Sequence, residues 1–166
     1  MKRLINITII LLSTINCLAQ ISQEVKLDSM QIIILASLVE KETELNEEKG
    51  KIARVFINRL SQDMFLQSNP SVQYAIGDTL FERKRITKTD IEFDSPYNTF
   101  KYKGLPPAPI CEPSQETIDA VRNAPQHNYL YFVLKPDFSG CFNYAETYKE
   151  LISYAREFRN ALNTKE

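Results

Sequence analysis

Apolar residues recur with the spacing of one helix face near the start of the domain and predict a helix over residues 29–43. The apolar stripe consists of Ile32, Leu35, Ala36 and Val39. Asp28 stands directly before this segment and Gln31 lies three positions further on, which is the pattern of a capping box at a helix N-terminus. We therefore expect a helix with a strongly apolar surface that begins directly after Asp28.

The same periodicity, with proline and glycine as boundaries, predicts the remaining elements. The further predicted helices cover residues 52–60, 70–76, 87–90, 115–123 and 145–162. The polar segment 46–50 is either a connection or the start of the helix over 52–60, and Glu47 and Glu48 suit the N-terminal end of that helix. The apolar run 129–134 predicts a buried strand, and the turn residues 136–140 lead into a return strand over 141–144. These elements indicate an α+β fold class, mainly helical, with a small antiparallel β-hairpin near the C-terminus.

The longest non-repetitive segment is residues 95–113, between two predicted helices. Four prolines fall between Pro106 and Pro113, and they fix φ and exclude a helix. A long ordered loop inside a compact domain usually serves function. We therefore expect this loop to form part of a binding surface.

Two carboxylates, Glu40 and Glu42, follow the apolar stripe of the first helix. Burial raises the pKa of a carboxyl group unless a partner compensates, and a glycosidase-type acid uses such a raised pKa. A helical wheel turns by about 100° per residue, so the two side chains project in different directions, and it does not choose between them. The alternative is that one or both glutamates lie at the border of the buried helix face, pair with lysine or arginine and have no catalytic role. Asn58 and Arg59, on the second helix, either brace such a carboxylate or face solvent.

A cluster of neutral hydrogen-bonding side chains surrounds Pro70. Its members are Gln67, Ser68, Asn69, Ser71, Gln73 and Tyr74. Amide, hydroxyl and aromatic groups together suit sugar recognition, although the same residues also occur in ordinary loops.

Composition excludes several classes of function. The chain has 166 residues, which is enough for one domain with a hydrophobic core. Its net charge of −1 does not indicate a nucleic-acid-binding protein, which would carry an excess of positive charge. The chain has one histidine, His127, which argues against a histidine zinc site and against a Ser-His-Asp site. Its four glycines form no phosphate-binding loop. Two classes of protein remain: an enzyme that uses carboxyl groups on a neutral polar ligand, and a protein without catalytic activity. We expect neither a metal nor a cofactor.

The N-terminus has the layout of a secretory signal peptide. Lys2 and Arg3 precede a mostly apolar run over residues 4–12, and Cys17 and Ala19 are small residues at cleavage-site spacing. We expect a signal peptide over 1–19 that is cleaved after Ala19, a short leader over 20–27 and the catalytic domain over 28–166. An uncleaved membrane anchor is the alternative. Either arrangement implies export to the periplasm or cell envelope.

Export also bears on the two cysteines beyond this segment, Cys111 and Cys141. An oxidising compartment allows such a pair to form a disulfide. Their spacing does not decide between a disulfide and two free thiols, so both remain open.

Six segments, in order, resemble the YceG-like family of endolytic murein transglycosylases. They are Leu35-Ala-Ser-Leu-Val-Glu-Lys-Glu-Thr43, Val55-Phe-Ile-Asn-Arg-Leu60, Leu66-Gln-Ser-Asn-Pro-Ser-Val-Gln-Tyr74, Ser95-Pro-Tyr-Asn-Thr99, Gly104-Leu-Pro-Pro-Ala-Pro-Ile110 and Tyr129-Leu-Tyr-Phe-Val133. The resemblance implies a lysozyme-like catalytic domain over 28–166. It also implies a lytic transglycosylase, a carbon–oxygen lyase that cleaves the β-1,4 bond between N-acetylmuramic acid and N-acetylglucosamine and leaves 1,6-anhydromuramyl ends.

The resemblance also implies roles for individual residues. It selects Glu40 as the catalytic acid and base, protonated because its helix face is apolar, and leaves Glu42, Asn58 and Arg59 as structural support. The substrate-binding residues it implies are Gln67, Asn69, Tyr74, Tyr97, Asn98, Thr99, Gly104, Leu105 and Pro106. The alternatives are a non-catalytic peptidoglycan-binding protein with a degenerate transglycosylase fold and a hydrolase, which would need a second carboxylate.

Three features depart from the family pattern. Asn69 occupies a position where aspartate is expected, and Glu150 is followed by Leu151 where histidine is common. The membrane helix and LysM-like module that usually precede the catalytic domain are not recognisable in residues 20–27. We therefore expect a minimal or partner-dependent enzyme, with glycan strands as substrate and either the cell-wall synthesis machinery or a separate docking subunit as partner.

Overall fold

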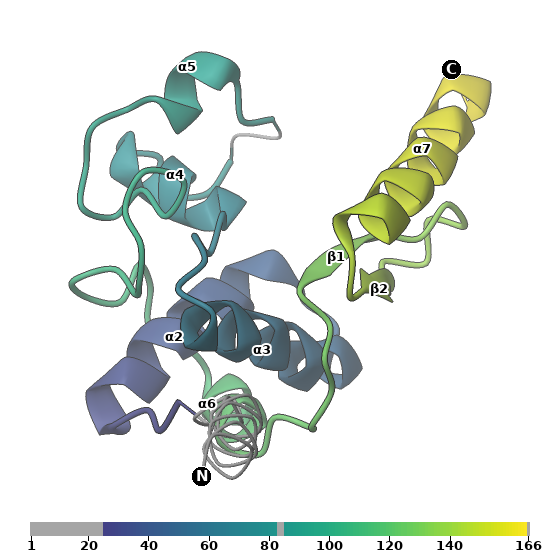
Figure 1. The fold of residues 1–166 in the computed structure, drawn as a ribbon. Helices are drawn as coiled ribbons and strands as arrows, with labels where there is room; N and C mark the ends of the chain where they lie inside the picture. Colours follow the sequence, from purple (N-terminus) through teal and green to yellow (C-terminus); the bar gives the residue numbers. More distant parts are fainter. Residues whose placement is uncertain (1–24, 83–84, 166) are drawn as a thin grey trace, which may run out of the picture.

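The computed structural model describes residues 25–82 and 85–165 (Figure 1). The predicted signal peptide and most of the predicted leader lie outside these residues. Val25 and Leu27, at the end of the leader, pack against the hydrophobic core. Within the described ranges, no helix combines the length and the apolar composition that a membrane crossing requires.

Helix α2, Ser29–Glu42, begins at the predicted capping box: the Asp28 carboxylate accepts from the Gln31 amide and the Gln31 side chain accepts from the Asp28 amide. The helix ends at Glu42, after which Thr43 is extended with φ −154° and ψ 145°. Its buried side chains form the centre of the core with those of α3, Asn46–Ser61. Helix α6, Gln115–Arg122, packs on both of them.

Two short helices, α4 (Asn69–Ala75) and α5 (Lys88–Ile91), lie together away from α6 (Figure 1). The segment from 95 to 113 has neither helix nor strand, as its prolines predict, and it is ordered by contacts with α2. The Ile110 amide donates to Ser37 Oγ at 3.0 Å, and Cys111 Sγ donates to the Ser37 carbonyl at 3.4 Å. The loop is therefore held against the middle of the first helix.

Strands β1, Tyr131–Leu134, and β2, Phe142–Ala145, form the predicted antiparallel hairpin. Phe132 anchors this hairpin, because its ring meets those of Phe56 on α3 and Phe142 on β2 edge-on. Helix α7, Tyr148–Lys165, packs against both strands and extends away from α2 and α3 in Figure 1.

The predicted fold class is confirmed, and the differences concern element ends. Helix α3 begins at Asn46, so the polar segment 46–50, which the sequence left open as a connection or a helix start, forms the first turn of the helix. Helix α7 begins three residues later than predicted, since Ala145 pairs with Tyr131 in the hairpin and Thr147 Oγ1 then accepts from the Glu150 amide. Cys111 and Cys141 are both free thiols.

Candidate active site

The two glutamates at the end of α2 project to different sides of the helix, as the wheel predicted. Glu40 points towards α6 and the first turn of α3, where it meets Ser114, Thr117 and Lys49. Glu42 points towards the residues before α4, where it meets Ser68. The two carboxyl groups therefore have separate surroundings, and these surroundings decide which chemistry each can perform.

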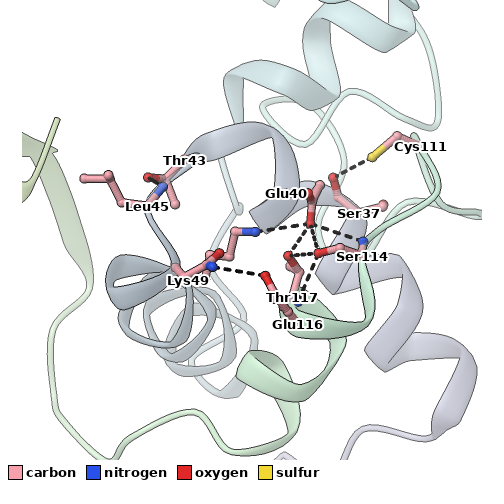
Figure 2. Close-up of polar contacts among 10 residues, drawn as sticks. Ser37, Glu40, Thr43, Leu45, Lys49, Cys111, Ser114, Glu116 and Thr117 are labelled. Atoms are coloured by element: carbon pink, nitrogen blue, oxygen red, sulfur yellow. Dashed lines mark hydrogen bonds and ion pairs between the residues drawn. The ribbon is translucent and has the colours of Figure 1, made fainter.

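The Glu40 carboxylate is fully engaged by its neighbours (Figure 2). Its Oε2 atom accepts from Ser114 Oγ at 3.0 Å, from the Ser114 amide at 3.3 Å and from Thr117 Oγ1. The ammonium group of the buried Lys49 lies 3.5 Å from the same oxygen. Glu40 thus joins α2 to the N-terminus of α6 and to α3.

These contacts set the protonation state of Glu40. Burial is the largest single influence and raises the pKa, but the hydrogen bonds from Thr117 and Ser114 and the charge of Lys49 together outweigh it. The pKa of Glu40 therefore lies below its ordinary value, and the group is a carboxylate at neutral pH. The prediction that an apolar helix face keeps Glu40 protonated is wrong.

The lowered pKa of Glu40 predicts a pH-dependent contribution to stability. Replacing Glu40 by glutamine should lower the free energy of unfolding by about 1–3 kcal/mol at neutral pH, because charge-assisted hydrogen bonds are lost. A group whose pKa falls on folding stabilises above its unfolded pKa, and this contribution disappears as the pH falls through the folded value. Urea denaturation of wild type and Glu40→Gln should therefore give a difference that shrinks below about pH 4.5. A difference that is constant with pH would contradict this account.

The surroundings of Glu42 raise its pKa, whereas those of Glu40 lower the pKa of that residue. Ser68 Oγ donates to Glu42 Oε1 at 2.7 Å, and the positive charge of Arg59 lies nearby. Both lower the pKa of Glu42, but desolvation by burial is larger and raises it to about 7. A carboxyl group with this pKa is substantially protonated at neutral pH, which a general acid requires.

Glu42 lines two cavities. The first, of about 230 Å³, is called here the Gln67 cavity. Its walls are Glu42, Arg59, Leu66, Gln67, Asn69, Phe100, Tyr131, Phe132 and Leu151. The second, of about 430 Å³, is called the Phe81 cavity, and its walls are Glu40, Lys41, Glu42, Thr43, Glu44, Leu80 and Phe81. Glu42 is thus a lining residue of both cavities.

Arg59 organises the Gln67 cavity. Its guanidinium group donates to three main-chain carbonyls and to Gln67 Oε1 at 3.2 Å. The carbonyls belong to Leu130 at 2.6 Å, Phe65 at 3.0 Å and Leu66 at 2.9 Å. Gln67 has a φ of 54°, in the left-handed region that non-glycine residues rarely adopt, so the contact with Arg59 helps to hold a strained residue at the cavity. Arg59 was predicted as structural support, and its charge also acts on Glu42.

Only part of the predicted substrate-binding set lies beside a glutamate. Gln67 and Asn69 share a cavity with Glu42. Tyr74 and Tyr97 stack on each other with ring centroids 4.8 Å apart, and both pack against the hydrophobic core. In the described part of the chain, neither tyrosine lines a cavity that contains Glu42.

Asn98 and Thr99 do not line a groove, because both are buried and fully used by the fold. Asn98 Nδ2 donates to two main-chain carbonyls, those of Ile91 and Phe93. Thr99 Oγ1 accepts from the Ser68 amide at 3.0 Å. Thr99 therefore holds Ser68, the residue that donates to Glu42, whereas Asn98 holds the end of α5 and the segment that follows it.

The predicted wall formed by the proline-rich loop lies elsewhere. Gly104, Leu105 and Pro106 border a different cavity, of about 400 Å³. Its other lining residues are Val25, Leu27, Gln31, Ile34 and Leu60. Asn58 supports the fold as predicted, but its side chain donates to the carbonyls of His127 and Tyr129 and braces no carboxylate.

Sequence reasoning missed the residues that distinguish the two glutamates. Ser114, Thr117 and Lys49 were assigned no role in the site. Ser68 was one polar residue among several around Pro70. Ser68, Ser114 and Thr117 have no local signal of their contacts, because the glutamates they bind lie 26 to 77 positions away along the chain. Lys49 is nearer to Glu40 in the chain, but its ion pair depends on how α3 packs beside α2.

The fold and the site define a class of protein: a mainly helical domain in which a carboxyl group with a raised pKa, at the end of a helix, lines two cavities. The sequence profile of the YceG-like family matches residues 7–157, and the chain belongs to this family.

Known proteins of this family are similar to the chain over much of its length. It is 35% identical over 140 residues, or 84% of the chain, to the endolytic murein transglycosylase of Bacillus subtilis (strain 168). It is 43% identical over 108 residues, or 62% of the chain, to the endolytic murein transglycosylase of Streptococcus pneumoniae serotype 2. The alignments span only 38% and 19% of these two relatives.

A solved structure supports the same relationship. The crystal structure of a YceG-like protein from Listeria monocytogenes superposes with a TM-score of 0.66 at 39% sequence identity. The match covers 72% of this chain and 38% of the Listeria chain.

Proposed function

We propose that this protein is an endolytic lytic transglycosylase of peptidoglycan, and that Glu42 is its catalytic acid and base. The names of the two bacterial relatives support the reaction class. The observation that carries the choice of residue is that Glu42, with its pKa raised to about 7, shares a cavity with Gln67 and Asn69. The signal-like N-terminus further supports export to the periplasm or cell envelope, where a separate docking subunit or the synthesis machinery would be the partner.

One carboxyl group is sufficient for the proposed reaction. Protonated Glu42 donates its proton to the glycosidic oxygen as the bond from that oxygen to muramyl C1 breaks. The resulting carboxylate removes the proton from the muramyl 6-hydroxyl, whose oxygen bonds to C1 and forms the 1,6-anhydro ring. Glu42 ends the cycle protonated, and no water is consumed. A hydrolytic route normally needs a second carboxylate, and Glu40 is held on the α6 side by four interactions.

Glu40 is assigned a different role from the one that family resemblance implied. Its carboxylate holds Ser114 and Thr117 at the start of α6, and it is charged where an acid must be neutral. We therefore assign Glu40 to positioning the end of α2 against α6.

The proposed reaction class can be tested through the chemistry of the product ends. Purified peptidoglycan is digested with the whole chain, and the new ends are identified by mass spectrometry. Anhydromuramyl ends support the proposal, since they differ from reducing ends by the loss of one water. Reducing ends would identify a hydrolase. Intact strands that retain bound protein would identify a non-catalytic peptidoglycan-binding protein.

The raised pKa of Glu42 predicts the pH profile of cleavage. The acid form is the active one in the first step, so the rate should fall as the pH rises above about 7. The measurement is the initial rate of formation of anhydro ends between about pH 5 and about pH 9. Glu40→Gln should keep the same alkaline limb. A rate that is already low at about pH 5 and shows no further fall near about pH 7 would indicate an acid with an ordinary pKa of about 4.5 and would exclude Glu42 in this role.

A further inference from the structure

The position of Glu42 between two cavities limits how a glycan strand can lie. An acid must come within hydrogen-bond reach of the glycosidic oxygen it protonates. That oxygen joins two sugar rings, which extend from it in opposite directions. Because Glu42 lines both cavities, a strand whose scissile linkage lies at Glu42 and whose one ring enters the Gln67 cavity can place its next ring in the Phe81 cavity.

We propose that the Phe81 cavity is a binding subsite for a neutral N-acetylhexosamine ring of the strand. This inference rests on the proposed function, because it takes Glu42 as the group above which the linkage lies. The cavity, of about 430 Å³, has room for a single sugar ring.

The lining of the Phe81 cavity provides both kinds of contact that a sugar ring uses. Leu80 is 76% exposed and, with the Phe81 ring, offers an apolar surface for the ring face. Lys41 Nζ lies 4.7 Å from the centre of the Phe81 ring, where its N–H groups can donate to sugar hydroxyls. The exposed carboxylate of Glu44 is an acceptor on the same wall.

The charges around the cavity favour a neutral ligand. The carboxylate of Glu40 is paired with Lys49, and Glu42 is substantially neutral at pH 7. The remaining charges, Lys41 and Glu44, have opposite signs. No surplus positive charge is left among these lining groups to hold a carboxylate-bearing ligand, so an uncharged acetylated sugar is the better match.

The backbone also holds Phe81 in an unusual conformation beside this cavity. Phe81 has a φ of 58°, which is strained for a bulky residue and persists only where the surroundings maintain it. The preceding turn does so: the Phe81 amide donates to the Asp78 carbonyl at 3.3 Å, and Asp78 Oδ1 accepts from the Glu82 amide at 3.1 Å. The turn thus keeps an aromatic side chain at a position next to the proposed acid.

Binding to a form without the acid tests the subsite independently of cleavage. The background is the whole chain with Glu42→Gln, and the probe is chitotetraose, a neutral β-1,4-linked N-acetylglucosamine tetramer, titrated by calorimetry. Adding Leu80→Ser or Phe81→Ala should weaken binding about tenfold each, since apolar contact with the sugar face is lost. Leu80 is so exposed that its replacement leaves folding intact, which keeps the test valid if Phe81→Ala is unstable.

The chain offers a matched control in Phe138, which lies in the β1–β2 turn. Phe138 has the same φ of 58° as Phe81, so Phe138→Ala replaces an aromatic residue of the same backbone conformation at a position away from Glu42. Its binding of chitotetraose should change by less than about twofold. The subsite is overturned if Leu80→Ser binds as tightly as the Phe138→Ala control, or if the background does not bind the tetramer. Cleavage that survives Glu42→Gln would overturn the acid assignment instead, which separates the two failures.

Discussion

Replacing Glu42 by glutamine should reduce the formation of anhydromuramyl ends by about 10²–10⁴-fold, the usual contribution of a positioned general acid. Glutamine has nearly the same shape and can still accept from Ser68, but it has no proton to donate to the glycosidic oxygen. The measurement is the initial rate of release of anhydro products from purified peptidoglycan. Glycan binding should remain, because glutamine nearly preserves the shape of residue 42 and the other walls of the Gln67 cavity are unchanged.

The matched control is Glu40→Gln, the same substitution two residues earlier on the same helix. It should lower stability but leave the rate within about tenfold of wild type when measured well below its melting temperature. If Glu40→Gln were the inactive variant and Glu42→Gln the active one, the roles would be reversed. In that case the lowered pKa of Glu40 would need a different explanation, such as a rearrangement of Ser114 and Thr117 when substrate binds.

Replacing Arg59 by methionine should cost about 3–5 kcal/mol of unfolding free energy, because removing a buried charged donor leaves its partners unsatisfied. Three main-chain carbonyls, those of Leu130, Phe65 and Leu66, lose their donor. Gln67 also loses the contact that supports its left-handed backbone. Urea denaturation followed by circular dichroism measures the change.

An arginine on the surface serves as the comparison. Arg122, whose side chain is about half exposed, pairs only with Asp119 one turn away, and Arg122→Met should change stability by less than about 0.5 kcal/mol. Arg59→Lys should be nearly as damaging as Arg59→Met, since a lysine cannot reach four acceptors in a planar arrangement. A loss of less than about 1 kcal/mol for Arg59→Met would show that the network does not hold the cavity together.

The helices and the hairpin follow from patterns that are local in the chain. The stripe from Ile32 to Val39, the capping box at Asp28 and the turn before β2 depend on residues within a few positions of each other. The start of α3 stayed open between a connection and a helix start, because its first turn, from Asn46, is polar and has no apolar stripe. The prolines between 106 and 113 correctly predicted irregular structure, but not which cavity the loop would border.

The assignment of the acid could not be made from the sequence, because an apolar helix face does not imply apolar surroundings. Glu40 follows the same stripe as the core residues, yet its carboxyl group meets two hydroxyls and an ammonium group from α6 and α3. For the same reason, Asn98 and Thr99 looked like groove residues. Polar side chains that satisfy buried main-chain groups have the same composition as those that bind sugar.

Helix α2 stops at Glu42, and Thr43 continues in an extended conformation. The carboxyl group therefore belongs to the last residue of a 14-residue helix, at the end where the peptide dipoles sum to a partial negative charge. A negative pole repels a carboxylate and favours the neutral acid, which acts in the same direction as desolvation. Where the helix ends thus tunes the proton affinity of the proposed acid, and Glu40, two residues further inside, lies further from that pole.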